Sequence, residues 1–480
     1  VNYVINYNNL GSGSIYDKPE SSATQWSLMS YLARINYSLY DRYLFSVNGR
    51  VDGSSRFGGN NKYGFFPSGS VAWRISEEGF MEPVKAVINN LKLRTSYGFT
   101  GNTEIGVYES LATLGSNSWT IGNQLVSGFY PNRIPNPDLK WEKTGQFDIG
   151  FDLGLFNNRL RLTADYYYKK TTDLLYNVAI PSASGYDSML KNIGSVQNKG
   201  YELSIESDNL SGAFSWTTAF NISFNRNKVL ELGGETYKDV GTYDDHLKTS
   251  DIRRLIVGQP IGVFYGYRFD GIFQNEAECA QQTSSPSPIG VGLRRYKDLN
   301  GDGKIDATND REILGDANPK FFGGMTNTFA YKGFELNVFL QYSYGNKIFN
   351  YNAMELESPT GGQNVYQDLV NRWTPTNPSN EYQKATTNRN NIVSDRFIED
   401  GSFLKLKTVS LSYSFPKLNW KHLGGLRLYV TGQNLLTWTK YRGYDPEVSY
   451  RGASTLEAGE DFGGYPQART FMFGIKLDIK

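Results

Sequence analysis

Long segments of this chain alternate apolar or aromatic residues with polar or charged ones, so each segment would have one apolar and one polar face when extended. The pattern is cleanest in residues 160–169, 214–225, 334–344 and 471–480. Strands of soluble sandwiches usually run about 5 to 6 residues, whereas a strand that crosses a membrane needs about 9 to 11. These segments are long enough to cross a bilayer, with lipid on one side and water on the other.

The composition narrows the class of protein further. The chain has 480 residues, of which 15% are aromatic and 50 are glycine, and its mean hydropathy is −0.48. No stretch approaches the roughly 20 apolar residues of a membrane helix. If this chain lies in a membrane, it must belong to a closed β-barrel, because open sheet edges cannot lie in lipid.

Several other classes of protein are disfavoured. A formal net charge of +1 gives no reason to expect nucleic acid as a partner, since nucleic-acid binding needs a clustered basic face. The lone Cys279 permits neither an internal disulfide nor a multi-cysteine metal site. Residues 1–20 contain no signal peptide. Because an outer-membrane protein needs one, we expect the natural chain to start upstream.

The pattern predicts 13 strands joined by connections that alternate between short and long. The strands are expected near residues 26–38, 42–53, 65–77, 89–101, 141–155, 158–172, 195–207, 214–228, 321–331, 334–345, 402–415, 425–437 and 466–480. The long connections include residues 102–140, 229–320, 346–401 and 438–465. Outer-membrane barrels have short periplasmic turns and long extracellular loops. The last strand is therefore expected to run inward and to leave the C-terminus in the periplasm.

The strand count predicts an incomplete barrel. Bacterial barrels have an even number of strands, and both chain ends lie in the periplasm. With 13 strands, the first strand would begin on the extracellular side, and residues 1–25 would be part of an extracellular loop. The polar face is predicted to carry five cations, and such a face needs a wide barrel. These cations are Arg50, Arg74, Arg94, Arg161 and Lys169. We therefore expect two free sheet edges, with residues 26–38 and 466–480 unpaired to each other.

Several motifs resemble those of the SusC/RagA family of TonB-dependent outer-membrane transporters, in the family's order. They are YLFSVNGRVDGSSRF (43–57), YGFFPSGSVAWRI (63–75), NPDLKWE (136–142), NIGSVQNKGYEL (192–203), YKDLNGDGKID (296–306), DGSFLKLKTVSLSYSFP (400–416) and QNLLTWTKYRGYDPE (433–447). The resemblance identifies residues 1–480 as the C-terminal part of an antiparallel transmembrane β-barrel of about 22 strands. The plug domain, the TonB box and about nine strands have no counterpart in this chain.

The same resemblance implies location and partners. The barrel would lie in the outer membrane of a Gram-negative bacterium, in contact with lipid and lipopolysaccharide. TonB would act through the N-terminal region that this chain lacks, and a SusD-like surface lipoprotein would cover the mouth as a lid. The cargo would be an oligosaccharide or a peptide too large for porins, and the sequence does not distinguish the two.

The sequence predicts no enzyme activity. Its two histidines, His246 and His422, fall in a polar loop and in a predicted periplasmic turn. A glycosidase needs two carboxyl groups, and the sequence has acid pairs such as Asp244 with Asp245 and Glu276 with Glu278; solvated loop residues are the better interpretation of both pairs. There is no Walker loop, dinucleotide fingerprint or zinc spacing.

One loop has the spacing of a calcium site. Residues 298–310 place side-chain oxygens of Asp298, Asn300, Asp302 and Asp306 at positions 1, 3, 5 and 9 of an EF-hand-like loop, with the Lys304 carbonyl at position 7. Gly303 falls at the sharp turn, and Ile305 would anchor the loop. Position 12 is Asn309 rather than glutamate, with Asp310 next, so a structural Ca²⁺ would be weakly held. The alternative is a Gly-rich turn whose acids face water.

Aromatic residues crowd the predicted outer loops. They are Trp119, Tyr130, Tyr237, Tyr243, Tyr265, Tyr366, Trp373, Tyr382, Tyr441, Tyr444 and Tyr465. They would stack on sugar rings, pack on a partner protein or simply stiffen long loops.

The favoured interpretation is that this chain is part of a TonB-dependent importer. The alternatives are a passive porin or surface-adhesion barrel and, less well supported by the connections, a soluble carbohydrate-active β protein.

Overall fold

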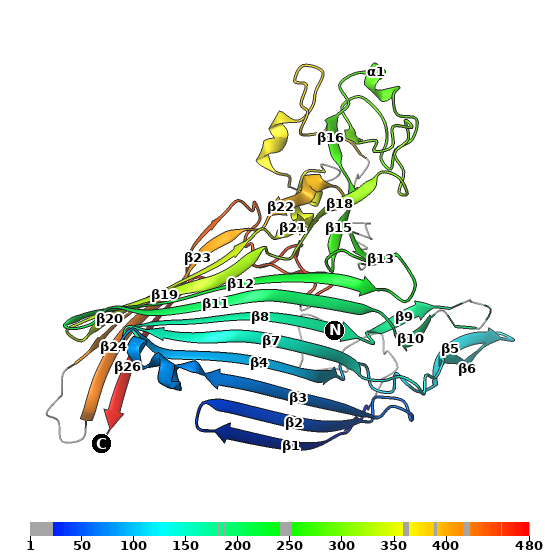
Figure 1. The fold of residues 1–480 in the computed structure, drawn as a ribbon. Helices are drawn as coiled ribbons and strands as arrows, with labels where there is room; N and C mark the ends of the chain where they lie inside the picture. Colours follow the sequence, from blue (N-terminus) through cyan, green and yellow to red (C-terminus); the bar gives the residue numbers. More distant parts are fainter. Residues whose placement is uncertain are drawn as a thin grey trace, which may run out of the picture.

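Thirteen long strands form one antiparallel sheet, which we call the wall (Figure 1). The computed structural model describes residues 23–479 except 181–182, 184, 187, 241–251, 359–363, 388–390, 416–422 and 453. The strands of the wall, in order, are β1 (Leu28–Leu39), β2 (Tyr43–Ser54), β3 (Tyr63–Arg74), β4 (Ile88–Asn102), β7 (Glu142–Leu155), β8 (Leu160–Thr172), β11 (Ser195–Leu210), β12 (Phe214–Glu231), β19 (Phe321–Tyr331), β20 (Phe334–Tyr344), β23 (Phe403–Ser414), β24 (Leu423–Thr439) and β26 (Thr470–Ile479). All 13 predicted strands are confirmed.

Four predicted boundaries are wrong by three residues or more. β11 and β12 extend to Leu210 and Glu231 rather than to residues 207 and 228. The last strand begins at Thr470 rather than at residue 466. The third ends at Arg74, because residues Ile75–Glu77 turn into the 3₁₀ helix η3, followed by η4 (Gly79–Val84). This turn is fixed by the Glu78 carboxylate, which accepts hydrogen bonds from Tyr43 Oη at 2.7 Å and Trp73 Nε1 at 2.9 Å.

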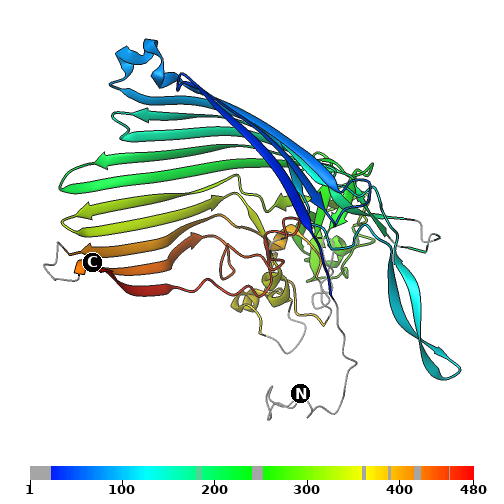
Figure 2. The ribbon, with the colours of Figure 1, turned by 90° about the horizontal axis from the view of Figure 1, so that it is seen from below.

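The wall has two free edges. Among the described residues, β1 pairs only with β2 and β26 only with β24, so they stand at opposite edges of the sheet (Figure 2). Residues 26–38 and 466–480 thus do not close a ring, as predicted. Residues 1–22 lie outside the described residues.

The register separates a polar face from an apolar face along the whole wall. On β4 and β7, Arg94 lies opposite Gly150 and Ser96 opposite Asp148, whereas Leu93 lies opposite Phe151 on the other face. Because successive strand residues point to opposite sides, the same division runs through the other pairs. The predicted alternation is therefore confirmed, and we call the polar side the inner face and the apolar side the outer face.

Short connections gather at one end of the wall and long ones at the other (Figure 2). The tightest turns have positive backbone φ angles, such as 45° at Lys332 and 89° at Gly333 between β19 and β20. Positive φ at both central residues is typical of two-residue hairpins, because that turn matches the twist of the strands. The exception is the 75–87 connection, which carries η3 and η4.

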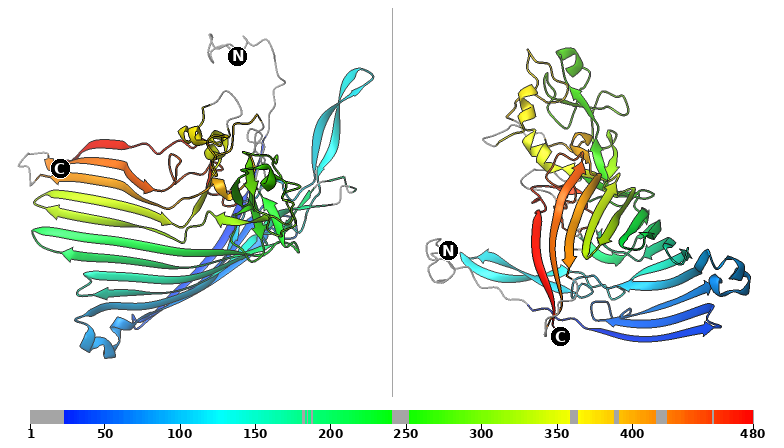
Figure 3. Two further views of the ribbon diagram at one scale, coloured as in Figure 1. Left: turned by 90° about the horizontal axis from the view of Figure 1, so that it is seen from above. Right: turned by 90° about the vertical axis from the view of Figure 1, so that its left-hand side faces the viewer.

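The long connections fold into structure of their own, which the sequence analysis did not predict. β5 (Thr113–Ile121) and β6 (Gln124–Arg133) form a hairpin that projects away from the wall (Figure 3). The others are β9 (Leu175–Ala179) with β10 (Ser188–Asn192), β13 (Tyr237–Val240) with β14 (Arg253–Ile256), β15 (Val263–Tyr267) and β18 (Arg311–Asp316), β16 (Phe269–Ile272) with β17 (Arg294–Tyr296), and β21 (Lys347–Asn350) with β22 (Ile398–Asp400) and β25 (Glu460–Asp461).

We call the described parts of residues 232–320, 345–402 and 440–469 the loop layer. Its core is apolar and includes Phe264, Phe349, Met354 and Phe397, each 0% exposed. Its helices are short: α1 (Glu276–Cys279), α2 (Tyr351–Leu356), and the 3₁₀ helices η6 (Gln367–Asn371) and η7 (Asp395–Phe397). Among the described residues, no helix is both long enough and apolar enough to cross a membrane.

Candidate functional site

The inner face of the wall carries charged side chains that are held by ion pairs. All five predicted cations lie on it by register. Arg94 binds both Asp152 (Nε to Oδ2, 3.3 Å) and Asp165 (Nη2 to Oδ2, 2.7 Å) across three strands. Arg161 bonds to Glu206 at 3.0 Å. Because each guanidinium is held by carboxylates, these charges line the face in fixed positions.

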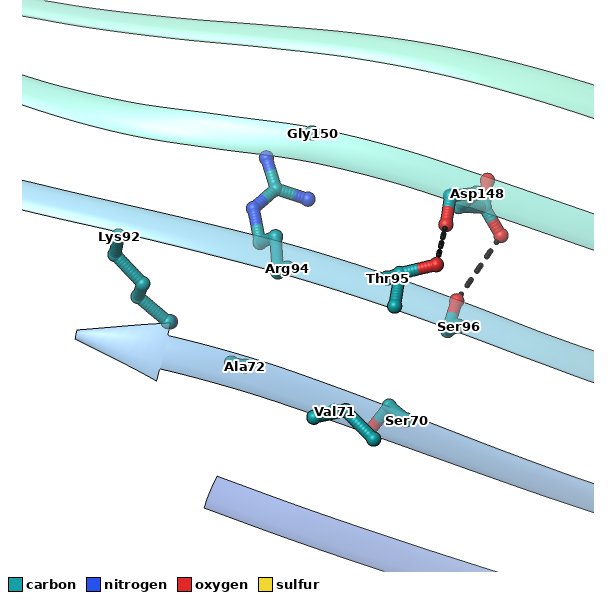
Figure 4. A pocket seen from close by; sticks show the side chains of 9 residues that line it. All are labelled: Ser70, Val71, Ala72, Lys92, Arg94, Thr95, Ser96, Asp148 and Gly150. Carbon is teal, nitrogen blue, oxygen red and sulfur yellow. Dashed lines mark hydrogen bonds between the residues drawn. The ribbon is translucent and has the colours of Figure 1, made fainter. Parts of the chain in front are cut away.

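An open, polar hollow lies on this face between β3, β4 and β7 (Figure 4). It measures about 270 Å³, and Lys92, Arg94 and Asp148 are among its lining residues. Ser96 Oγ donates to Asp148 Oδ2 at 3.2 Å. Such a surface offers both donors and acceptors, so it suits a hydrated cargo or a polar protein surface better than an apolar one.

A buried ionic cluster ties the loop layer together. Glu357, whose side chain is 1% exposed, binds Arg396 (Oε2 to Nε, 2.7 Å) and Arg442 (Oε1 to Nη1, 3.2 Å), with Arg294 Nη2 at 3.9 Å. Arg442 also binds Glu399 at 2.9 Å. The cluster joins three long connections that are far apart in sequence. No local pattern marks these residues as partners, although Arg442 lies within the 433–447 motif, and the cluster therefore could not be predicted from the sequence.

A second cluster fastens residues 440–469 to the inner face of the wall. The buried Lys405 of β23 places its Nζ 2.6 Å from Asp445 Oδ1 and 2.6 Å from Glu447 Oε2. Lys407 Nζ lies 3.0 Å from the same Glu447 oxygen, and Gln341 donates to the other. Burial alone would raise the pKa of Glu447, but the bonds to Lys405 and Lys407 outweigh it and hold the pKa below its ordinary value of 4.5.

This fastening is expected to be pH-dependent. Because the pKa of Glu447 is lower in the folded protein, the stabilisation is fully present above about pH 4.5 and is lost as the pH falls through the lowered value. The protection of residues 440–450 against hydrogen exchange, relative to the intrinsic rate at each pH, should therefore fall in acid, below the ordinary glutamate range. A Glu447→Gln variant should show faster exchange of these residues already at neutral pH, and a smaller loss of protection in acid. If the loss of protection in acid were unchanged in this variant, groups other than Glu447 would be responsible for the pH dependence.

The predicted calcium loop is anchored as expected. Gly303 has a φ of 78°, and Ile305 is 2% exposed and packs with Tyr267 and Tyr296. Its acids bond to the loop's own backbone: Asp298 accepts from the amides of Gly301 and Gly303 at 2.6 and 2.7 Å. Asp302 accepts from the Lys304 amide at 2.8 Å.

Asp310, the last residue of this loop, also hydrogen-bonds to the loop's backbone. Asp310 is 0% exposed, and its two oxygens accept from the amides of Leu299 and Asp306 at 2.8 Å each. Asp306 accepts from the amides of Asn309 and Thr308, which lowers its pKa. Across the described residues, no group of three His, Cys, Asp or Glu is arranged to hold a metal ion. Calcium binding by Asp298, Asn300, Asp302, Asp306 and the Lys304 carbonyl stays a prediction.

The predicted loop aromatics divide into two kinds. Tyr382 and Tyr441 are buried and stiffen the loop layer, whereas Tyr444 and Tyr465 are 79% and 91% exposed. Trp119 and Tyr130 are exposed on the projecting hairpin. Tyr243, His246 and His422 lie outside the described residues.

A curved antiparallel sheet with one polar and one apolar face, long strands and connections sorted by length defines the wall of an outer-membrane β-barrel. Comparison with known proteins gives the family: residues 2–273 match "TonB dependent receptor-like, beta-barrel", and the chain belongs to this family. The wall therefore lies in the outer membrane of a Gram-negative bacterium.

Three relatives illustrate the similarity. TonB-dependent receptor P3 of Formosa agariphila is 41% identical over 98% of this chain and 48% of its own length. TonB-dependent receptor SusC of Bacteroides thetaiotaomicron is 32% identical over 95% of this chain and 44% of its own. The structure of the RagAB peptide transporter superposes with a TM-score of 0.82 at 28% identity, over 97% of this chain and 49% of that one. The chain spans about half the length of the relatives it matches.

Proposed function

We propose that this chain forms part of the wall of a TonB-dependent importer that takes up an oligomeric nutrient, a glycan or a peptide, and has no enzyme activity of its own. The observation that carries the proposal is the inner face, whose fixed ion pairs and polar hollows suit a wide, hydrated passage. Relatives named TonB-dependent receptors and a peptide transporter of the same fold support it. In this proposal TonB acts through a plug in the N-terminal region of the intact protein.

The proposal is tested by uptake in the native bacterium. Cells in which the gene is deleted should lose growth on one large nutrient and regain it with the intact gene. Deletion of TonB should abolish the same uptake, because release into the periplasm requires energy from the inner membrane. Uptake that persists without TonB would favour the passive porin, and loss of surface attachment with uptake unchanged would favour the adhesion barrel.

We also propose that a SusD-like lipoprotein docks on the long-connection end, burying about 2,000 Å² or more, as permanent complexes do. The projecting hairpin supports this. β5 and β6 pair only with each other, and an isolated two-stranded hairpin is at best marginally stable in water. One of its faces carries Trp119, Ile121 and Val126, which are 59%, 68% and 44% exposed. A partner that covers this face would stabilise the hairpin.

We further propose that the 298–310 loop binds Ca²⁺ and so stiffens the loop layer. The acids already close the loop through backbone amides, so calcium should add rigidity without changing the fold. Added calcium should slow hydrogen exchange of residues 298–310 in the purified protein, and Asp302→Ala should abolish the effect. Glu276→Ala, an exposed acid of the same layer, should leave it unchanged. Equal exchange with and without calcium in the unaltered protein would show that the motif is only a turn.

A further inference from the structure

A row of cations crosses the outer face of the wall near its long-connection end. Lys143 of β7, Lys170 of β8, Lys199 of β11 and both Arg226 and Lys228 of β12 form this row, which we call the basic row. The registers place them on the apolar side, because Lys199 lies between Tyr168 and Arg226, and two residues further along, Tyr201 lies between Tyr166 and Phe224. The basic row continues the lipid-facing surface toward the outside of the cell.

The cations of the basic row differ from those of the inner face in having no acidic partner. Among the described residues, none of the five forms an ion pair, and all but Lys143 are exposed. Lys143 Nζ lies 4.0 Å from the centre of the Phe99 ring. Arg226 donates only to the carbonyl groups of Asn225 and Lys320, at 2.8 and 3.0 Å. By contrast, inner-face arginines such as Arg94 and Arg161 form ion pairs with carboxylates, which largely neutralise their charge.

Lys199 and Arg226 lie directly opposite each other on neighbouring strands. Like charges in that position repel, so the arrangement is destabilising unless an anion lies between them. The outward positions of β7, β8 and β11 near the row include no aspartate or glutamate. On β12 the nearest acid is Glu231, opposite Ser195, and among the described residues it forms no ion pair with the row. The anion that lies between Lys199 and Arg226 is therefore expected to come from outside these strands.

The residues next to the basic row follow the order of a membrane interface. Tyr168, Tyr201 and Phe224 come immediately below the row, and aliphatic residues such as Leu203 and Ile222 come next. Aromatic side chains prefer the boundary between headgroups and hydrocarbon, and long cationic side chains extend from there toward the headgroups. The cations thus lie at the level of the headgroups of the outer leaflet.

The same rim carries an aromatic hollow on later strands. It measures about 540 Å³ and is open on the outer side. Its lining includes the outward Phe321, Tyr342, Tyr344, Leu404 and Trp438, together with Lys440 and the carboxylate of Asp400. Rings and a cation together at this level suit a sugar headgroup that bears phosphate.

We propose that the basic row binds the phosphate groups of lipopolysaccharide in the outer leaflet, with Lys199 and Arg226 holding one phosphate between them. Guanidinium and ammonium groups are the usual protein ligands of phosphate. A second copy of this chain is a poorer occupant, because a two-fold contact through this face would bring basic row against basic row. The inference rests on the outer-membrane location and not on import, so its failure would leave the import proposal standing.

The test compares two matched double variants of the intact transporter. Lys199→Gln with Arg226→Gln removes the opposed pair, and Lys85→Gln with Lys332→Gln removes two cations at the short-turn end. Purified lipopolysaccharide, and the same material after enzymatic removal of its phosphates, are titrated onto each protein in mild detergent. Since one basic residue near an anionic lipid surface contributes a factor of about five, the first variant should bind lipopolysaccharide roughly 30-fold more weakly. The second variant should bind like the unaltered protein.

Dephosphorylated lipopolysaccharide should bind the unaltered protein as weakly as intact material binds the Lys199 and Arg226 variant. Equal affinity of the unaltered protein for both lipid forms would overturn the proposal. So would undiminished binding by the Lys199 and Arg226 variant. A photoreactive residue at position 197, between Lys170 and Lys228, gives an independent check in whole cells. It should crosslink to lipopolysaccharide, and crosslinking only to a protein would overturn the assignment.

Discussion

Replacing Glu357 by alanine should loosen the loop layer by about 3–5 kcal/mol while the wall stays folded. Removing one partner of a buried ionic cluster leaves uncompensated charge, and that is the costly change. The carboxylate serves Arg396 and Arg442 directly and lies beside Arg294, and both Glu357 and Arg294 have 1% exposed side chains. Arg442 keeps Glu399, so the uncompensated charge falls mainly on Arg396, whose Nε lies 2.7 Å from Glu357.

Native-state hydrogen exchange measures this effect segment by segment. The amides of α2 and β21 should exchange roughly two to four orders of magnitude faster in Glu357→Ala, since each 1.36 kcal/mol is a factor of ten. Amides of β7 and β8 in the wall should not change. Glu82→Ala is the control, because Glu82 is 67% exposed in its pair with Lys85 and such pairs contribute little. Unchanged exchange of α2 in Glu357→Ala would show that the apolar core around Phe349 and Phe397 holds the layer without the ions.

The wall could be predicted because its physics is local and periodic. A strand between lipid and water must alternate at every second residue, so segments such as 160–169 and 334–344 show their strands directly. The predicted boundary at residue 77 failed because the β3 strand ends on a specific contact. The Glu78 carboxylate accepts hydrogen bonds from Tyr43 and Trp73, and an alternation of polar and apolar residues does not reveal such a contact.

The loop layer could not be predicted for the opposite reason. Glu357, Arg294 and Arg442 come from three connections and become partners only after the chain has folded. The same holds for Lys405 and Glu447, which sequence separates by 42 residues. The basic row was hidden differently: its cations are spread over four strands, and only the registers of β8, β11 and β12 bring Lys170, Lys199 and Arg226 into one line.

Placing charge on the apolar face of the β5–β6 hairpin should release the lipoprotein partner. Trp119 and Val126 lie directly opposite each other, so Trp119→Asp with Val126→Asp puts two carboxylates at the centre of the proposed contact. Loss of one buried aromatic anchor commonly costs 2 kcal/mol or more, and two buried, unpaired charges add to that. Together the changes should weaken docking by at least about 100-fold, measured by recovery of the lipoprotein with the affinity-tagged transporter in mild detergent.

The other face of the same hairpin supplies the control. Ser118 and Ser127 also lie directly opposite each other, but their side chains point away from Trp119. Ser118→Asp with Ser127→Asp therefore adds the same charge to the same hairpin, on a face that also exposes Phe129, at 75%. Because this charge lies outside the proposed contact, docking should stay within about threefold of the unaltered protein. Equal loss in both double variants would mean that docking depends on net charge or hairpin folding rather than on the Trp119 face. Full retention in the Trp119 and Val126 variant would place the partner elsewhere on the loop layer.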